Sequence, residues 1–247
     1  MDLREQCGAT VQRHPWETSR VKALAKILLG DSLHEGMRIL DIGCGDSYLC
    51  STLFSLVSDR RITAVDINLT KGQIERLQNA ARGITYLTQL PPEGSCFDLT
   101  LLLDVVEHVQ DDQQFLAEIV ARHVPGRGRV LVTVPAFEQL YSSHDRFLGH
   151  YRRYRLKAVE KLARTAGLEI ISSGYLFGCL LFPKLILYKI LKISKSSDGI
   201  GCWSRGAAVT AIIEKLLHLD NCLMITAARA GVKLPGLTAW VLCGKQP

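Results

Sequence analysis

The segment that governs the architecture reads Arg38-Ile39-Leu40-Asp41-Ile42-Gly43-Cys44-Gly45-Asp46-Ser47. An apolar, β-prone run ends in an acid, and two glycines then lead into a polar turn, after which a helix is predicted from residue 48. Gly43 and Gly45 have no β-carbon, so the bare backbone of the turn can approach a ligand closely. Because ligands of open α/β sheets bind at the carboxyl ends of the strands, this turn is expected to line a binding crevice.

The same turn favours S-adenosylmethionine (SAM) over a dinucleotide. A dinucleotide-binding turn reads G-x-G-x-x-G and holds a pyrophosphate at a helix N-terminus. Here no third glycine stands at that spacing. Asp41 would repel a pyrophosphate, whereas it suits a ligand that carries an ammonium or sulfonium group. A glycine turn that binds nothing is the alternative for this segment taken alone.

Two further predicted strands also end in acids. Asp66 stands where an acid commonly accepts hydrogen bonds from the ribose hydroxyls of a nucleotide. The alternative is that Asp66 only caps the helix expected to begin at Lys71. The other strand end reads Asp104-Val105-Val106-Glu107-His108-Val109 and would place its side chains at the rim where a methyl group is presented.

Strand and helix patterns alternate along the chain, which indicates a parallel sheet with right-handed crossovers. Strands are expected at 37–42, 61–66, 84–87, 97–103, 129–134, 168–173 and 237–243. Helices are expected at 14–29, 48–57, 71–81, 113–123, 155–166, 207–217 and 222–230. The segment 136–154 is expected to be irregular. Gly167 is expected to end the helix at 155–166.

Composition narrows the class of protein. The chain has 247 residues, 47% of them apolar, which supports a substantial core. The net charge of +6 is a mild excess without a dense basic stripe, so nucleic acid is not favoured as a partner. The 8 cysteines form no C-x-x-C pair, which indicates reduced thiols and no structural zinc. No secretory signal or uncharged spanning segment is visible, so a cytoplasmic protein is expected.

The order of these motifs resembles that of class I SAM-dependent methyltransferases. Within them the chain is similar to a bacterial subgroup that couples a V-P-A strand end with an H-D-x-x-L-G-H-Y-R-R-Y segment. Both patterns stand in this sequence, at 134–136 and 144–154. The methyltransferase resemblance covers roughly 38–134, and the subgroup resemblance covers most of the chain.

The resemblance implies an α/β, Rossmann-like fold with helices on both faces of a seven-stranded, mostly parallel sheet. It also implies one SAM-dependent methyltransferase domain over 1–247. Its expected parts are an N-terminal helix (14–36), a SAM-binding core (37–135), a substrate loop and sixth strand (136–177), a helical insertion or lid (178–235) and a last strand (237–243).

The family's cofactor contacts carry over to matching positions. They are Trp16, Arg20, Asp41, Gly43, Cys44, Gly45, Asp66, Ile67, Gln89, Leu90, Asp104 and Val105. Asp66 would hold the ribose hydroxyls and Ile67 would pack on adenine. Gln89 stands where the family commonly has an acid for the adenine amino group. Arg20 would pair with the SAM carboxylate, and a surface arginine is the alternative.

If the acceptor is a hydroxyl, a general base is useful, and histidine is the first candidate. The candidates are His108, His144 and His150, with Asp145 able to orient an imidazole, and a purely structural histidine is the alternative. No carboxylate cluster is visible, so no metal site is predicted.

The end of the segment 144–154 offers contacts for the acceptor itself. Tyr151, Arg152 and Arg153 would bind an anionic acceptor. The alternative is that one arginine pairs with a core acid and the other is solvated.

The segment 179–195 is apolar but basic. On a helical wheel Lys184, Lys189, Lys192 and Lys195 share one face, and Phe182, Ile186, Ile190 and Ile193 share the other. Such a helix can lie on an anionic bilayer as a peripheral contact at the inner membrane face. A lid over the active site or a homodimer surface is the favoured alternative.

The sequence therefore predicts an enzyme that moves a methyl group from SAM to an oxygen or nitrogen of a small molecule, leaving S-adenosylhomocysteine. The acceptor is expected to be anionic or hydrophobic. One alternative is a lipid or polyprenyl-linked acceptor at the membrane surface. Another is a non-catalytic SAM-binding partner subunit. An NAD-dependent reductase is disfavoured by the missing third glycine.

Overall fold

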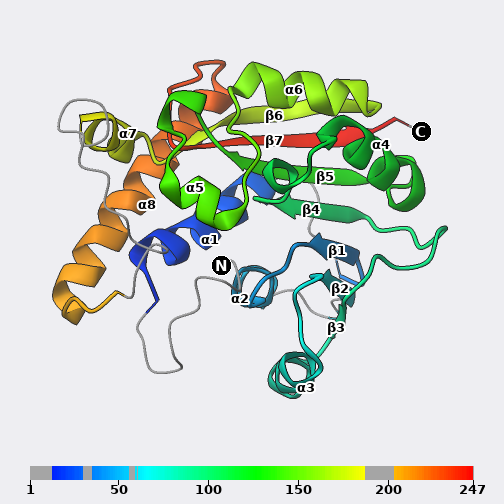
Figure 1. Cartoon of the computed structure of the whole chain (residues 1–247). Helices are drawn as coiled ribbons and strands as arrows, with labels where there is room; N and C mark the ends of the chain where they lie inside the picture. The colour runs from blue at the N-terminus through cyan, green and yellow to red at the C-terminus, as the bar shows by residue number, and fades with distance from the viewer. Residues whose placement is uncertain (1–12, 30–34, 56–58, 60, 187–202, 247) are drawn as a thin grey trace.

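The molecule is built on one seven-stranded sheet with strand order β3-β2-β1-β4-β5-β7-β6 (Figure 1). The structure is a computed structural model, and it describes residues 13–29, 35–55, 59, 61–186 and 203–246. The strands are β1 (Arg38–Ile42), β2 (Arg61–Val65), β3 (Ile84–Leu87), β4 (Leu99–Leu103), β5 (Arg129–Pro135), β6 (Leu168–Leu176) and β7 (Thr238–Lys245). The five strands β1 to β5 pair in parallel, whereas β7 runs antiparallel between β5 and β6.

Helices cover both faces of the sheet. They are α1 (Pro15–Leu28), α2 (Tyr48–Leu53), α3 (Lys71–Ala80), α4 (Asp112–His123), α5 (Ser143–Leu148), α6 (Leu156–Thr165), α7 (Gly178–Leu185) and α8 (Ala207–Arg229). In Figure 1 α6 runs along β6 at the top and α4 lies near β5 at the right, whereas α1 and α8 lie at the left below β7. Of the two core clusters, one contains residues of α1, α2 and most of the buried residues of α8, and the other contains those of α4 and α6 together with Met224 of α8. The predicted fold class is confirmed.

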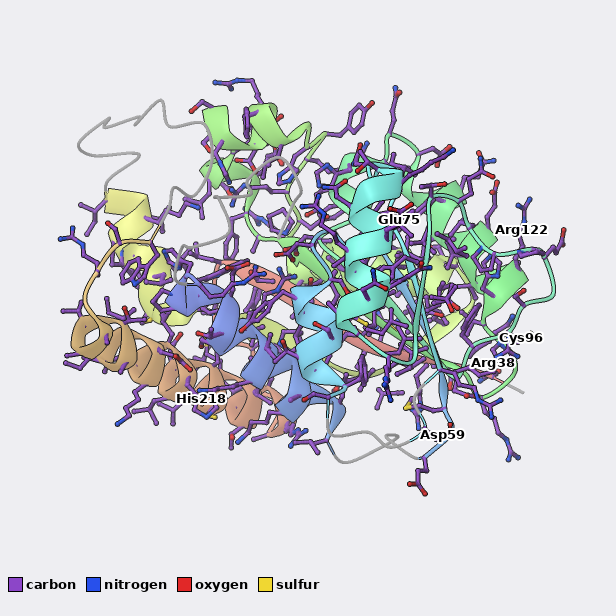
Figure 2. The ribbon with its side chains drawn as sticks, turned by 90° about the horizontal axis from the view of Figure 1, so that it is seen from below. Arg38, Asp59, Glu75, Cys96, Arg122 and His218 are labelled. Atoms are coloured by element: carbon purple, nitrogen blue, oxygen red, sulfur yellow. The ribbon has the colours of Figure 1, made fainter. Side chains whose placement is uncertain are left out.

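The central strands form where the sequence is apolar without alternation. Every residue of β4 is buried, as is every residue of β1 after Arg38. This is the pattern of parallel strands that are covered on both faces. Figure 2 places Arg38, Asp59 and Cys96, which lie at or before the starts of β1, β2 and β4, toward one end of the molecule. The carboxyl ends of these strands therefore lie at the other end.

The strand order reverses between β1 and β4. The helices that follow these two strands, α2 and α4, pack on opposite faces of the sheet. These two strands pair in parallel with Ile42 opposite Leu102. The turn after β1 and the turn after β4 are consequently neighbours in space. A crevice at such a reversal is where open α/β sheets bind their ligands.

One long helix replaces the two that the sequence predicts at 207–217 and 222–230. The helix α8 runs through Asp220 and Asn221, which lie between the two predicted helices and bond to other parts of the chain. Asn221 Oδ1 accepts from the Phe177 backbone N–H at 2.9 Å, and its Nδ2 donates to Ser19 Oγ at 3.2 Å. Asp220 Oδ1 accepts from the Cys179 backbone N–H at 3.1 Å.

The segment 136–154 is also more regular than predicted, because it contains α5. Ser142 and Asp145 cap the helix start reciprocally, and Gly149 ends it in the left-handed region with φ +78°. A capping box of this kind satisfies backbone donors that would otherwise have no partner. Smaller differences concern the ends of elements: β6 continues to Leu176, and α2 ends at Leu53, short of the predicted 57.

Gly236 provides a test of how tightly β6 is packed against the chain that enters β7. A β-carbon at Gly236 would lie 2.2 Å from the backbone oxygen of Leu176 and 2.8 Å from Met224 Cε. Gly236→Ala is therefore expected to lower the free energy of unfolding by about 1–3 kcal/mol, as overpacking does. Urea denaturation measures this change.

The matched control is Gly72→Ala in α3, where a β-carbon meets nothing within 4 Å. That variant is expected to be as stable as the wild type or up to about 1 kcal/mol more stable. An unchanged unfolding midpoint for Gly236→Ala would show that the backbone of Leu176 moves away without cost.

Candidate active site

The turn after β1 is pressed against the turn after β4. Gly43 and Gly45 adopt the left-handed region with φ +74° and +54°. A β-carbon at Gly43 would lie 2.5 Å from Val105 Cγ2, so only glycine fits beside the β4 turn. The backbone N–H groups of Gly43 and Cys44 donate to Val65 O at 2.7 and 3.1 Å. These bonds fix the turn Gly43–Gly45 at the carboxyl end of the sheet, where its backbone is not covered by side chains of its own glycines; this turn is called the cradle below.

Asp66 at the end of β2 bonds to this cradle. Its Oδ2 accepts from the Gly45 backbone N–H at 3.0 Å and its Oδ1 from the Asn68 backbone N–H at 2.9 Å. Helix α3 is capped by Thr70 in a capping box with Gln73, so Asp66 is not its cap. The alternative that gave Asp66 only a capping role is wrong.

An apolar surface lies beside Asp66 in the chain. Ile67 is 82% exposed and Leu90 is also exposed, as is the adjacent Gln89. A side chain as large and apolar as isoleucine gains free energy when it is covered. The exposed Ile67 next to an acid-bearing strand end therefore suits a flat apolar ligand group.

Asp41 carries a buried carboxyl whose Oδ1 finds no hydrogen-bond partner among the described residues. Burial raises the pKa of Asp41 to about 7, and the charge of Asp66 acts in the same direction. A buried polar atom without a partner calls for an explanation. An ammonium or sulfonium group bound nearby would supply the missing positive charge.

Arg20 ties α1 to the ends of β4 and β5. Its Nη1 lies 2.7 Å from Asp104 Oδ2, and its Nη2 donates to Thr133 Oγ1 at 2.8 Å. Thr133 Oγ1 in turn donates to Asp104 Oδ1 at 3.0 Å, and Asp104 is held at φ +58°. The Arg20 guanidinium also lies over the ring of Trp16, 5.1 Å from its centroid. Arg20 is buried, so the alternative of a surface arginine is wrong.

A short 3-10 turn after β4, Val106–His108, brings three chemistry-bearing side chains together. One potential ligand atom from each of Glu107, His108 and His150 lies within 4.8 Å of the other two. The imidazole rings of His108 and His150 meet edge to face with centroids 4.6 Å apart. Glu107 is fully buried, and neither carboxylate oxygen has a hydrogen-bond partner in the described part of the chain. No metal-ligand spacing is visible in the sequence, because His150 comes from a segment more than 40 residues away from His108.

Asp145 orients His150 rather than its sequence neighbour His144. His150 Nδ1 lies 2.9 Å from Asp145 Oδ1, and Arg153 donates to both oxygens from Nε at 2.8 Å and Nη2 at 3.0 Å. Successive residues on a helix point in different directions, which explains why His144 does not take this place. Two further bonds come from Ser142.

The ionisation of Asp145 determines which ring nitrogen of His150 carries a proton. Burial alone would raise the pKa of Asp145, but the hydrogen bonds from His150 and Arg153 outweigh it and hold the pKa well below its usual value. An ionised carboxylate only accepts hydrogen bonds, so His150 Nδ1 carries a proton. The other ring nitrogen, Nε2, is then the one available to a ligand or a proton.

The two arginines of the run 151–153 have different surroundings. Arg153 is buried in its ion pair with Asp145, whereas Arg152 is partly exposed and lies 3.0 Å from Asp112 Oδ2. Tyr151 is exposed. Arg153 is therefore paired with a core acid, as one of the two alternatives for this run predicts. Tyr151 is the most exposed of the three residues.

His144 lies on α5 and has another basic side chain as a neighbour. Burial first, and then the charge of Lys184, lowers the pKa of His144. Burial also lowers the pKa of Lys184 to about 8. Phe182 of α7 and Ile186, which follows α7, are exposed. The predicted residues Lys189, Ile190, Lys192, Ile193 and Lys195 lie outside the described residues. Among the described helices none is long and apolar enough to cross a membrane.

Two residues near the site, Arg13 and Thr133, were not singled out from the sequence. Arg13 bonds to Asp46 and lies over the ring of Tyr48, 4.1 Å from its centroid. Thr133 bridges Arg20 and Asp104. No pattern marks Arg13 or Thr133, because each acts through a partner far away in the chain.

The raised pKa of Asp41 has a measurable consequence for stability. Between about pH 4 and 7 the native state keeps a proton on Asp41 that the unfolded chain releases, so the free energy of unfolding falls as pH rises. We expect Asp41→Asn to remove this fall, so that its stability relative to wild type grows by about 4 kcal/mol across the window and then levels off. Urea denaturation at intervals from pH 4 to 8 gives the difference, and a difference that does not change with pH would contradict the burial of a protonated Asp41.

Comparisons with known proteins agree with this geometry. A family model described as a methyltransferase domain matches residues 16–173. The ubiquinone biosynthesis O-methyltransferase of Chelativorans sp. strain BNC1 is 32% identical over 106 residues, which are 40% of this chain and 41% of that protein. The chain thus matches about two fifths of the length of this curated relative.

Solved structures share the fold. The 1,6-didemethyltoxoflavin-N1-methyltransferase of Burkholderia thailandensis, solved with S-adenosylhomocysteine, has a TM-score of 0.56 at 16% identity and covers 94% of this chain and 81% of its own. Phosphoethanolamine N-methyltransferase 2 of Haemonchus contortus, solved with SAM, has a TM-score of 0.56 at 18% identity and covers 92% of this chain and 52% of its own. The chain belongs to the methyltransferase-domain family, which confirms the predicted enzyme class, and it shares its fold with methyltransferases that were solved with SAM or S-adenosylhomocysteine.

Proposed function

We propose that this enzyme transfers the methyl group of SAM to a hydroxyl oxygen of a small, largely apolar acceptor. The observation that carries the proposal is the adjacency of two sites. The bare-backbone turn at Gly43 touches Val105, and Glu107 and His108 follow Val105 directly in the next turn. A donor in the cradle and an acceptor at the imidazoles would therefore be neighbours.

The cofactor is proposed to lie across the carboxyl ends of β1 and β2. Its methionine part and ribose would follow Asp41, Gly43, Cys44 and Gly45. Asp66 accepts one hydrogen bond on each oxygen and keeps further lone pairs for ribose hydroxyls.

The adenine and the amino-acid end of SAM would meet the rim of the cradle. Ile67 and Leu90 would flank the adenine, and Gln89 would meet its amino group. Trp16 and Arg20 would close the methionine end, with Asp104 and Val105 below the sulfonium. Arg20 already gives both Nη groups to Asp104 and Thr133, so its contribution to the SAM carboxylate would come from the remaining Nε, which has no partner among the described residues.

Methyl transfer needs alignment more than it needs polar groups. The acceptor oxygen, the methyl carbon and the sulfur must lie in line, and holding them so supplies much of the rate. The positive charge of the sulfonium disappears in the transition state. The acceptor hydroxyl must also lose its proton, and the side chains that would meet it are those of Glu107, His108 and His150.

Support for an apolar hydroxyl acceptor comes from two sources. Phe147 and Tyr151, on either side of His150 in the chain, are exposed aromatic side chains that can pack on a ring. The relatives that match with 30–32% identity are named as O-methyltransferases of ubiquinone biosynthesis. Arg153 is paired with Asp145 and Arg152 with Asp112, so both arginines of this run already have an acidic partner, which favours an acceptor without an anionic group.

A lipid-linked acceptor at a membrane surface is the second candidate, favoured by exposed apolar side chains. Ile212, Leu216, Leu219 and Leu223 recur at helical spacing along α8, and each is more than half exposed. Phe182 of α7 and Ile186 just after it are exposed as well. A row of this kind can insert into the headgroup boundary of a bilayer.

Two variants test the primary proposal, one at the proposed SAM site and one at the proposed acceptor site. Asp66→Ala should weaken SAM binding about 5- to 150-fold, because hydrogen bonds to a charged acceptor contribute about 1–3 kcal/mol. His150→Ala should leave the SAM dissociation constant unchanged while it lowers kcat at least tenfold. Calorimetry with SAM and S-adenosylhomocysteine measures the first effect, and S-adenosylhomocysteine formation with phenol, alcohol and amine acceptors measures the second.

Measurements on the wild type test whether SAM is bound and which class of acceptor is methylated. Absence of binding heat with both SAM and S-adenosylhomocysteine would overturn the proposal as a whole. Turnover with amines alone would overturn the choice of a hydroxyl.

Vesicle flotation tests the second candidate. If the acceptor is lipid-linked, the wild type should float with vesicles that contain anionic lipid, and Leu216→Glu with Leu223→Glu should abolish flotation without changing SAM affinity. The matched control is Glu75→Gln on α3, away from this row, which should float as the wild type does. A wild type that stays at the bottom of the gradient would exclude the membrane candidate.

A further inference from the structure

We propose that Glu107, His108 and His150 bind a divalent metal ion that activates the acceptor hydroxyl, a role that rests on the methyl transfer proposed above. One nitrogen or oxygen from each residue lies within 4.8 Å of the other two. Ligand atoms of one metal ion lie roughly 3–4 Å apart, because each metal–ligand distance is about 2.0–2.2 Å. To hold one ion, the three side chains would have to move closer together than they lie here.

Glu107 is the observation that points to a ligand. Its side chain is fully buried, and neither carboxylate oxygen has a hydrogen-bond partner among the described residues. A protonated carboxyl in this place would still leave its O–H without an acceptor, which is unfavourable for a buried group. A metal ion supplies both the charge and the partner.

His150 is already held as metal-binding histidines are. Such a histidine commonly donates its second ring N–H to a carboxylate, which fixes the ring and raises the basicity of the nitrogen that binds the metal. Here Asp145 accepts from Nδ1 at 2.9 Å, and Arg153 and Ser142 keep Asp145 in place. Nε2 is then the nitrogen left for a metal.

The ligand set limits the metal. Two imidazoles and one carboxylate suit Zn²⁺, Mn²⁺, Fe²⁺ and neighbouring ions, whereas Mg²⁺ and Ca²⁺ prefer oxygen ligands. Three protein ligands leave coordination positions open for an acceptor. This arrangement differs from a histidine base acting alone, because the metal lowers the pKa of the bound hydroxyl directly.

The transfer step is balanced without an oxidant or reductant. The metal-bound hydroxyl loses its proton to water. The resulting oxygen attacks the methyl carbon, and the new C–O bond forms as the C–S bond breaks. Both electrons of the C–S bond go to sulfur, so that the products are the methyl ether and neutral S-adenosylhomocysteine.

Metal binding can be measured without turnover. The tag-free full chain is treated with EDTA, dialysed, and titrated with Mn²⁺ under electron paramagnetic resonance, then with Zn²⁺ by calorimetry. The wild type should bind one equivalent of Mn²⁺ that Zn²⁺ displaces. Glu107→Gln, which keeps the shape of the side chain, and His108→Asn should each weaken Mn²⁺ binding at least tenfold. His144→Ala, the matched control on α5, should leave Mn²⁺ affinity unchanged.

Parallel measurements separate this proposal from the proposed function. The same metal-free samples are titrated with SAM and assayed for methyl transfer with and without added Mn²⁺, and circular dichroism checks that each variant is folded. Absence of stoichiometric Mn²⁺ and Zn²⁺ binding by a wild type that binds SAM, or full turnover in EDTA, would overturn the metal site and leave methyl transfer standing. Wild-type affinity for Mn²⁺ in both folded variants would overturn the assignment of the ligands. A chain that binds Mn²⁺ but not SAM would overturn the function and not the site.

Discussion

The parallel pairing of β1 with β4 is the constraint from which the site follows. Ile42 lies opposite Leu102, so the two strands end at nearly the same level. The turns that follow the two strands are therefore in close contact. Val105 of the second turn leaves no room for a β-carbon at position 43 in the first. The contact sets the distance between the cradle at the end of β1 and the polar groups that follow β4. A side chain at position 43 would push the two halves of the proposed site apart.

A second constraint is the buried carboxylate of Asp145, which organises a segment without regular strands. It accepts hydrogen bonds from Ser142, His150 and Arg153, and so joins the start of α5 to the chain beyond its end. Breaking a buried ion pair by removing one partner typically costs 3–5 kcal/mol, because the other charge is left uncompensated. The loop is therefore as rigidly specified as a core element, which suits a segment that positions an imidazole.

Two acids next to the site are buried without full compensation. Asp41 and Glu107 both have pKa values raised by burial, and both have carboxylate oxygens that lack partners in the described part of the chain. Groups of this kind lower the stability of the folded state at neutral pH. Unfavourable burial is commonly found where a bound ligand supplies the missing charge, and perturbed titration is for that reason a marker of functional sites. Their positions, at the end of β1 and just after β4, coincide with the expected donor and acceptor ends.

The sequence alone determined the alternation of strands and helices, the glycine turn after β1, the acidic strand ends and the class of cofactor. Each of these is written in local patterns of a few residues, because apolar runs, glycines and capping residues act over short distances. Only the tertiary structure decided that Asp145 holds His150 and not His144, that Arg20 pairs with Asp104, and that α8 continues through Asn221. These outcomes depend on partners that lie between 5 and 84 positions away in the chain, or on the direction in which a helix points a side chain. A linear pattern carries no record of such contacts, which is why Glu107, His108 and His150 become one cluster only when the chain is folded.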